Sequence, residues 1–165
     1  MIELALVLGA FAAMECFAAV SHRVLMHGRG FVWHRAHHRP RRGRVDANDL
    51  FPLIFAIVTI AVIALGTAVP SLRALASVGV GVTTYGAAYF VVHDICIHGR
   101  LAGRPVGSRG YLGYVRRAHH LHHATGAEPF GFLVPVTRRR GANFVPSATE
   151  SLRASGTEAR RVKTS

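Results

Sequence analysis

Three long apolar stretches constrain the fold of this chain more than any other feature of its sequence. They run over Ile2–Val20, Leu50–Val69 and Ala74–Val92, and only the first holds charged residues, Glu3 and Glu15. Each stretch approaches the roughly 20 residues that a helix needs to cross the hydrocarbon core of a bilayer. The sequence therefore predicts an all-α integral membrane protein with about three transmembrane helices.

The basic residues predict how these spans are oriented. Of the 20 Lys and Arg residues, seven lie in Ser21–Asp49 and twelve lie from Arg100 onward, so that only Arg73 lies between the second and third stretches. With three spans, the two basic segments fall on one side of the membrane and Arg73 falls on the other. The positive-inside rule makes the basic side cytoplasmic, and we expect the N-terminus to face outward.

The charge balance also bears on partners and domains. A formal net charge of +12 is typical of nucleic-acid binders, but half of the residues are apolar and the mean hydropathy is +0.29. A membrane protein with its charge confined to loops accounts for both values, so we expect membrane lipids and no nucleic acid as partners. Residues 1–146 are predicted to form one membrane-embedded domain. Residues 147–165, which lack periodicity, are predicted to form a basic disordered tail.

The histidines form a pair of motifs that occurs twice in the same order. A His-x4-His motif is followed by His-x2-His-His, and each His-x4-His lies at an end of an apolar stretch on the basic side. All ten motif histidines can therefore converge. The first copy is His22, His27, His34, His37 and His38, and the second is His93, His98, His119, His122 and His123.

The motif spacings favour metal binding. Helical offsets of three and four residues put the three rings of His-x2-His-His within an arc of about 100°. The offset of five residues between His22 and His27 turns about 140°, so these rings share a metal only if the helix ends or distorts between them. Gly28 and Gly30 favour an ending. Ten imidazoles imply two metals, and imidazole suits Zn, Cu, Fe and Ni, so spacing alone does not choose the metal.

His120 is the eleventh histidine and makes a second register possible, His120-x2-His123. We favour His119 because only His119 completes the His-x2-His-His triple. His120 is then a surface neighbour or a residue that contacts a ligand histidine.

Residues close to the motifs could orient the ligands. Glu15 lies seven residues before His22 on the same helix face. It could orient an imidazole, hold a proton or make an interhelical contact. Asp94 and Asp49 could accept ring N–H bonds, with helix capping or loop solvation the alternative for Asp49.

The third apolar stretch carries two further patterns. Tyr85, Tyr89 and His93 follow at steps of four residues, and they line a substrate channel or pack against a neighbouring helix. Small residues in the same stretch are expected to allow close helix packing. These are Gly79, Gly81 and Gly86.

At these residues the chain resembles the bacterial β-carotene 3-hydroxylases, within the membrane-bound fatty acid hydroxylase and sterol desaturase superfamily. The resemblance runs from about Met14 to Val136 and departs from the family at His120, where a non-ligand residue is expected. It includes segments around and between the histidine motifs. These are Met26-His27-Gly28, Trp33-His34, Asn48-Asp49-Leu50, Val92-His93-Asp94, Gly110-Tyr111-Leu112 and Phe130-Gly131-Phe132-Leu133.

The resemblance implies a non-haem di-iron monooxygenase of the bacterial inner membrane, with the ten motif histidines as ligands of two iron ions. It would use O2 and electrons from a ferredoxin-type donor to convert β-carotene to β-cryptoxanthin and zeaxanthin. The chain shows no nucleotide-binding glycine motif, so the electrons must come from outside. The alternatives are a carotenoid ketolase or a fatty-acyl or sterol hydroxylase or desaturase. A membrane metal transporter would need ligands near the bilayer midplane, whereas here they lie at one face.

Overall fold

The computed structural model describes residues 1–39, 43, 45–101 and 109–136, and these residues form helices and loops without a strand. The predicted tail at 147–165 and the domain boundary at residue 146 lie outside them. Two of the helices continue directly into π-helices, in which backbone hydrogen bonds join residues five apart instead of four. The elements in order are α1 (Ile2–Ser21), η1 (His22–Arg29), α2 (Phe31–His34), η2 (Ala47–Asp49), α3 (Leu50–Ala68), η3 (Pro70–Leu72), α4 (Ala74–Tyr89), η4 (Phe90–Ile97) and α5 (Gly110–Thr125).

Three helical segments are long and apolar enough to cross a membrane, as the sequence predicts. They are Ile2–Arg29, Ala47–Ala68 and Ala74–Ile97. The spans bury few of their residues inside the protein, and large side chains such as Leu8, Ile57 and Ile60 are at least 59% exposed. Exposed apolar surface of this extent is suited to contact with lipid.

The third span packs against both of the others, and glycines make the approach possible. A Cβ atom on Gly81 would lie 2.4 Å from the carbonyl oxygen of Val7 on α1, and one on Gly79 would lie 2.3 Å from the side chain of Ile63 on α3. The packing role predicted for these two glycines is confirmed. The prediction for Gly86 is wrong, because a Cβ atom there would meet nothing within 4 Å.

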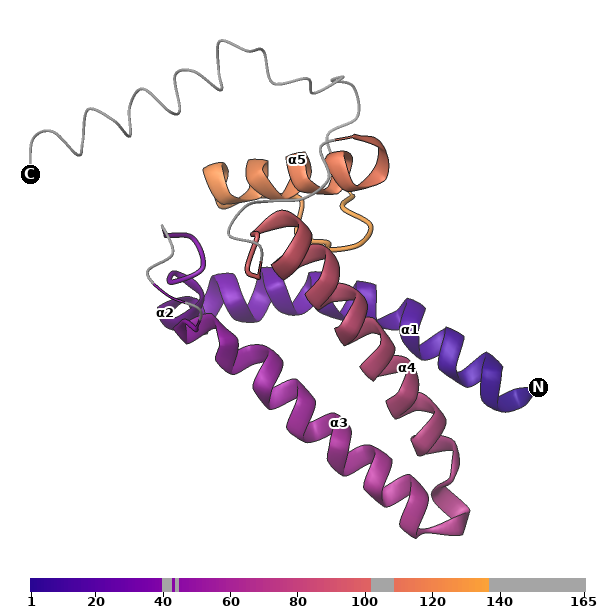
Figure 1. The fold of residues 1–165 in the computed structure, drawn as a ribbon. Helices are drawn as coiled ribbons and strands as arrows, with labels where there is room; N and C mark the ends of the chain where they lie inside the picture. Colours follow the sequence, from indigo (N-terminus) through magenta and orange to yellow (C-terminus); the bar gives the residue numbers. More distant parts are fainter. Residues whose placement is uncertain (40–42, 44, 102–108, 137–165) are drawn as a thin grey trace, which may run out of the picture.

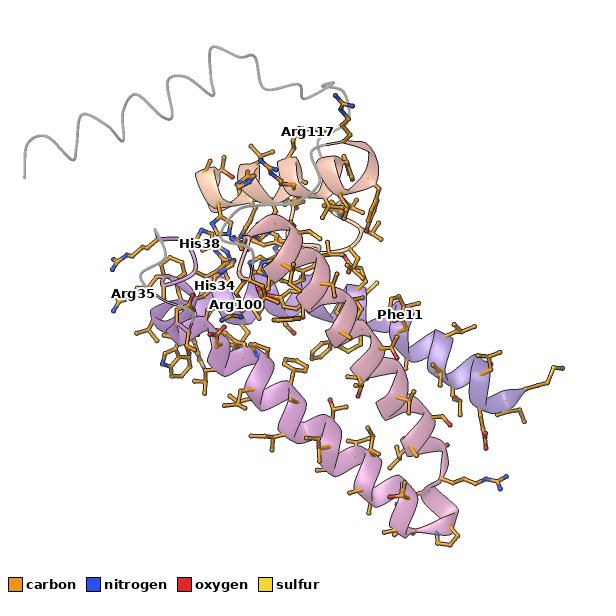
Figure 2. All side chains as sticks on the ribbon, in the orientation of Figure 1. Phe11, His34, Arg35, His38, Arg100 and Arg117 are labelled. Atoms are coloured by element: carbon orange, nitrogen blue, oxygen red, sulfur yellow. The ribbon has the colours of Figure 1, made fainter. Side chains whose placement is uncertain are left out.

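The connections bring all the histidine motifs to one end of the molecule. The short η3 turn, with Pro70 at its first position, joins α3 to α4 at the far end (Figure 1). α5 lies beside η4, at the opposite end of the third span. Figure 2 shows His34 and His38 in the region between α2 and α5, whereas Arg35 and Arg117 project away from it.

Candidate metal centre

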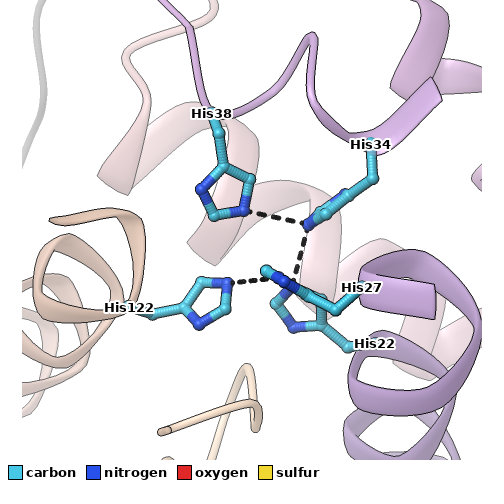
Figure 3. Close-up of side chains that lie close together, drawn as sticks. All are labelled: His22, His27, His34, His38 and His122. Carbon is cyan, nitrogen blue, oxygen red and sulfur yellow. Dashed lines mark hydrogen bonds between the residues drawn. The ribbon is translucent and has the colours of Figure 1, made fainter. Parts of the chain in front are cut away.

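Two groups of histidines hold their ring nitrogens close enough to bind metal ions. Within each group the candidate ligand atoms all lie within 4.8 Å of one another. Cluster A, shown in Figure 3, consists of His22, His27, His34, His38 and His122. Cluster B consists of His37, His93, His98 and His119.

The two copies of the sequence pattern exchange one histidine. Cluster A takes four histidines from the first copy and His122 from the second, whereas cluster B takes three from the second copy and His37 from the first. His37 and His122 occupy the same position of the repeated triple, so the middle histidine of each triple crosses to the other cluster. The last histidine of the second triple, His123, contacts both clusters. Its ring centroid lies 4.4 Å from that of His119 and 4.6 Å from that of His37 in cluster B, and 4.4 Å from that of His38 in cluster A.

The π-helices bring the two rings of each His-x4-His motif close together. In η4 the backbone N–H of His98 donates to the carbonyl oxygen of His93 at 3.0 Å, which joins the two motif residues across one widened turn. Their ring centroids lie 4.6 Å apart, and those of His22 and His27 in η1 lie 5.1 Å apart. The distortion required by the sequence is therefore present, and the regular helix ends just beyond, where Gly28 leaves helical geometry.

The two triples differ in local structure. The second lies on the regular helix α5, which ends at Gly126 in the left-handed conformation at φ 66°. The first begins at the last residue of α2, His34, and continues through turns, with the N–H of His37 donating to the carbonyl oxygen of His34. Each triple contributes histidines to both clusters, so neither triple binds through a single cluster.

Four of the buried ligand candidates donate through Nδ1 to fixed acceptors. In cluster A, His22 donates to the carbonyl oxygen of Phe130 at 3.0 Å and His34 donates to Asn48 Oδ1 at 2.7 Å. His122 donates in the same way to a carbonyl oxygen, that of Ala127. In cluster B, His93 donates to Asp94 Oδ1 at 2.9 Å. A neutral imidazole with its proton on Nδ1 offers the lone pair of Nε2 to a metal.

The inward nitrogens face one another in a way that suits bound cations. The Nε2 atoms of His22 and His34 are 3.1 Å apart although both rings carry their proton on Nδ1, so two lone pairs oppose each other. A metal ion between such nitrogens removes the repulsion. Three further buried Nε2 atoms have no hydrogen-bond partner among the described residues, those of His37, His93 and His123. The donor set of each cluster thus fits a metal that accepts imidazole nitrogen.

Burial keeps the imidazoles outside the spans neutral. It lowers the pKa of His34 and of His122 to about 4, and that of His123 to about 2. The pKa of His119 is also held well below its usual value by burial. These rings are therefore in the neutral, metal-binding form at pH 7.

Of the two carboxylates predicted to support a histidine, Asp94 contacts a ring directly, whereas Asp49 contacts Arg100, which in turn binds Asp94. Asp94 accepts from His93 and also from Arg100 Nη1 at 2.7 Å. Asp49 instead caps η2, where its side chain accepts from the N–H of Asp46, and pairs with the other nitrogen of Arg100. Arg100 therefore ties the start of the second span to the end of the third.

Asn48 is the polar contact that inspection of the sequence did not single out. It is 7% exposed and holds the ring of His34. Its sequence signals are its place in the Asn48-Asp49-Leu50 segment of the family resemblance and at the start of an apolar stretch. His120, by contrast, is exposed on α5 and belongs to neither cluster.

Glu15 does not contact a histidine ring but anchors a segment that does. We call this segment, Ala127–Val136, the strap. The Glu15 carboxylate accepts three backbone N–H groups of the strap at 2.9–3.1 Å and the hydroxyl of Tyr85 at 2.7 Å. Of the three alternatives for Glu15, the structure shows the interhelical contact, from α1 to Tyr85 on α4.

The strap places aromatic rings against both clusters. Phe132 stacks on the ring of His22 at 4.9 Å and lies edge-on to His93 at 5.4 Å. Tyr89 stacks on His93 at 4.6 Å and meets Phe132 edge-on, so it packs beside cluster B. Phe132 from the strap and Tyr89 from α4 thus place apolar ring faces directly against His22 and His93.

Fold and site together define a class: a helical membrane protein with paired histidine clusters at one end of its spans. Comparisons with known proteins are consistent with this class and narrow it. A family model described as fatty acid hydroxylase matches residues 7–139, and the chain belongs to this family. No solved structure matches the chain.

Three similar proteins carry related names. A beta-carotene hydroxylase of Pseudescherichia vulneris is 47% identical over 125 residues, covering 73% of this chain and 70% of that protein. The beta-carotene hydroxylase of Pantoea ananas is 42% identical over 124 residues, with the same coverage of 73% and 70%. A chloroplastic beta-carotene 3-hydroxylase of Haematococcus lacustris is 34% identical over 156 residues, covering 90% of this chain and 47% of that protein.

Proposed function

We propose that this chain hydroxylates the rings of β-carotene, forming β-cryptoxanthin and then zeaxanthin. The observation that carries the proposal is the pair of buried histidine clusters in a chain 47% identical to a beta-carotene hydroxylase. Each hydroxylation would combine one C–H bond with O2, two electrons and two protons. One oxygen atom would enter the product and the other would leave as water.

The proposed cofactor is a pair of iron ions. Cluster A would hold one and cluster B, together with His123, would hold the other, through inward-facing ring nitrogens. Iron bound there would supply the redox chemistry that activates O2 towards a C–H bond, which redox-inert zinc does not supply. Imidazole also binds zinc and copper, and metal analysis distinguishes iron from both.

The residues of the chain would orient the ligands and exclude water. Asn48 and Asp94 hold the rings of His34 and His93 by their Nδ1 atoms, which keeps each Nε2 directed inward. The rings of Phe130 and Phe132 pack against His22 of cluster A. A substrate dissolved in the bilayer would therefore approach the reacting centre past apolar rings.

The electrons would come from a ferredoxin-type donor on the cytoplasmic side. Arg35 and Arg117 project away from the clusters at the same end of the molecule (Figure 2). Basic side chains at this surface would attract an acidic donor and speed its encounter with the site. The same charges would hold this end on the cytoplasmic face of a bacterial inner membrane.

Expression in bacteria that accumulate β-carotene tests the proposal. Pigment chromatography should show β-cryptoxanthin and zeaxanthin, and metal analysis with Mössbauer spectroscopy should show two irons per active chain. A keto product would identify a ketolase, and unchanged β-carotene beside an iron-loaded chain would favour an acyl or sterol substrate. Full activity with one zinc ion per chain would contradict the iron mechanism.

A further inference from the structure

A groove runs along α1 beneath the strap. Its volume is about 630 Å³. On α1 it is lined by residues at helical spacing, Ala12, Cys16 and Ala19, and on the strap by Phe130 and Leu133. Ala12 and Cys16 are exposed on the outer surface of a span, so the groove opens where a bilayer would surround the protein.

The groove is elongated and has one polar end. Phe11 and Arg23 both line it, and the step of twelve residues from one to the other corresponds to roughly 18 Å, over half of the bilayer's hydrocarbon thickness. At the histidine end Arg23 lies 4.0 Å from Glu128, and both side chains are partly exposed. The rest of the lining is apolar except for Glu15 and Tyr85, and these two are hydrogen-bonded to each other.

Glu15 does not make the groove unfavourable for a hydrocarbon. Both of its carboxylate oxygens accept hydrogen bonds, from the strap N–H groups and from Tyr85. A carboxylate whose acceptors are already engaged needs no water from the groove.

The ring of Phe130 contacts both the groove and cluster A. Phe130 lines the groove, and its ring centroid lies 5.6 Å from that of His22, 5.4 Å from that of His27 and 5.2 Å from that of His122. A molecule lying along α1 would therefore bring its end at the polar side to within one ring's thickness of the histidines.

We propose that this groove binds the carotenoid, with the polyene chain along α1 and one end ring against Phe130. This inference rests on the proposed function and names the site where its substrate binds. A linear hydrocarbon with a ring at each end fits a groove that is long, apolar and open to lipid, and it can enter sideways without crossing water. Phe130 then sets how closely the ring approaches cluster A.

The test fills the groove at one residue and uses its neighbour as the control. Ala12 lines the groove, whereas Ala13 is equally exposed on the same helix but points elsewhere. In β-carotene-accumulating bacteria, Ala12→Trp should lower zeaxanthin per membrane-inserted chain by about 10- to 200-fold, the range for a changed fit in a hydrophobic pocket. Ala13→Trp should stay near wild type. Cys16→Trp, one turn further along the groove, should repeat the Ala12→Trp result.

A second readout does not depend on turnover. Iron-loaded protein purified without oxygen should retain β-carotene in the wild type and in Ala13→Trp, and should lose it in Ala12→Trp with its iron content unchanged. Equal product from Ala12→Trp, Cys16→Trp and Ala13→Trp would show that the groove does not bind the carotenoid. It would not contradict the proposed function. The proposed carotenoid site would also be wrong if Ala12→Trp displaced a phospholipid instead of β-carotene and product formation stayed unchanged. A wild type that forms no hydroxylated carotenoid would instead refute the proposed function itself.

Discussion

At the scale of single residues, the atoms that orient the histidines decide what the clusters can bind. The histidines themselves were predictable, because a motif pair that occurs twice at the ends of apolar stretches is typical of a metal site. Their partners were only partly predictable. Asp94 follows His93 directly, whereas the carbonyl oxygen of Phe130 reaches His22 from 108 residues away. Contacts of that kind depend on the packed fold and leave no local pattern.

Asn48 provides a prediction at this scale. Asn48→Leu removes the acceptor for His34 Nδ1 at similar side-chain size, so the ring loses its fixed orientation. Iron content or hydroxylation per chain should fall by about 10- to 100-fold. Asn48→Asp, which keeps an oxygen at this position, should retain most of both. Wild-type iron and product in Asn48→Leu would show that His34 is held by other contacts.

His119 and His120 are adjacent but differ in environment, which allows a matched comparison. His119 is 6% exposed within cluster B, whereas His120 is exposed on the outer side of α5. His119→Ala should lose metal and turnover, and His120→Ala should change either by less than about 10-fold. Iron and zeaxanthin are measured per membrane-inserted chain. The reverse result would mean that the last motif is in the other register.

At the scale of elements, widened turns and close helix contacts build the site. The five-residue spacing of His22 and His27 indicated that the helix must end or distort, and both occur, the distortion as a π-helix. The exchange of His37 and His122 between clusters could not be foreseen. It depends on how the turns that carry His37 after α2 pack against η4 and α5, which lie far away in the sequence.

Gly81 and Gly86 give a prediction about helix packing. Gly81→Ala would place a Cβ atom 2.4 Å from the backbone of α1, and backbone cannot move aside as a flexible side chain can. We expect it to destabilise the protein by about 1–3 kcal/mol, as overpacking does. Gly86→Ala meets open space and should be neutral or slightly stabilising. Thermal unfolding in detergent measures both, and equal midpoints would contradict the packing role of Gly81.

At the scale of the whole molecule, the three spans and the basic loops predict which face of the membrane carries the site. The number of spans follows directly from hydropathy. The ends of two helices extend beyond the apolar stretches, because the π-helices carry the histidines past them. Hydropathy alone could not predict this extension, since it includes polar residues such as Arg23 and Asp94.

The orientation is open to a direct test. Reporters fused after Gly43 and after Arg73 should report opposite compartments, with Gly43 on the cytoplasmic side, because 19 of the 20 basic residues lie on that side of a three-span chain. Alkaline phosphatase, active only outside, and a fluorescent protein, active only inside, make a complementary pair. Both fusions reporting the same compartment would contradict the three-span arrangement.

The way the strap is attached affects how the site can change in evolution. It is attached through its main chain: its N–H groups donate to Glu15, and its carbonyl oxygens accept from Tyr111, Tyr114 and two histidines. Hydrogen bonds made by the main chain do not depend on which side chains the strap carries. Residues such as Leu133 and Val134 can therefore be exchanged without detaching the segment. Variation in substrate range should accumulate there first, and libraries randomised at these positions are the natural starting point for altering which molecules are accepted.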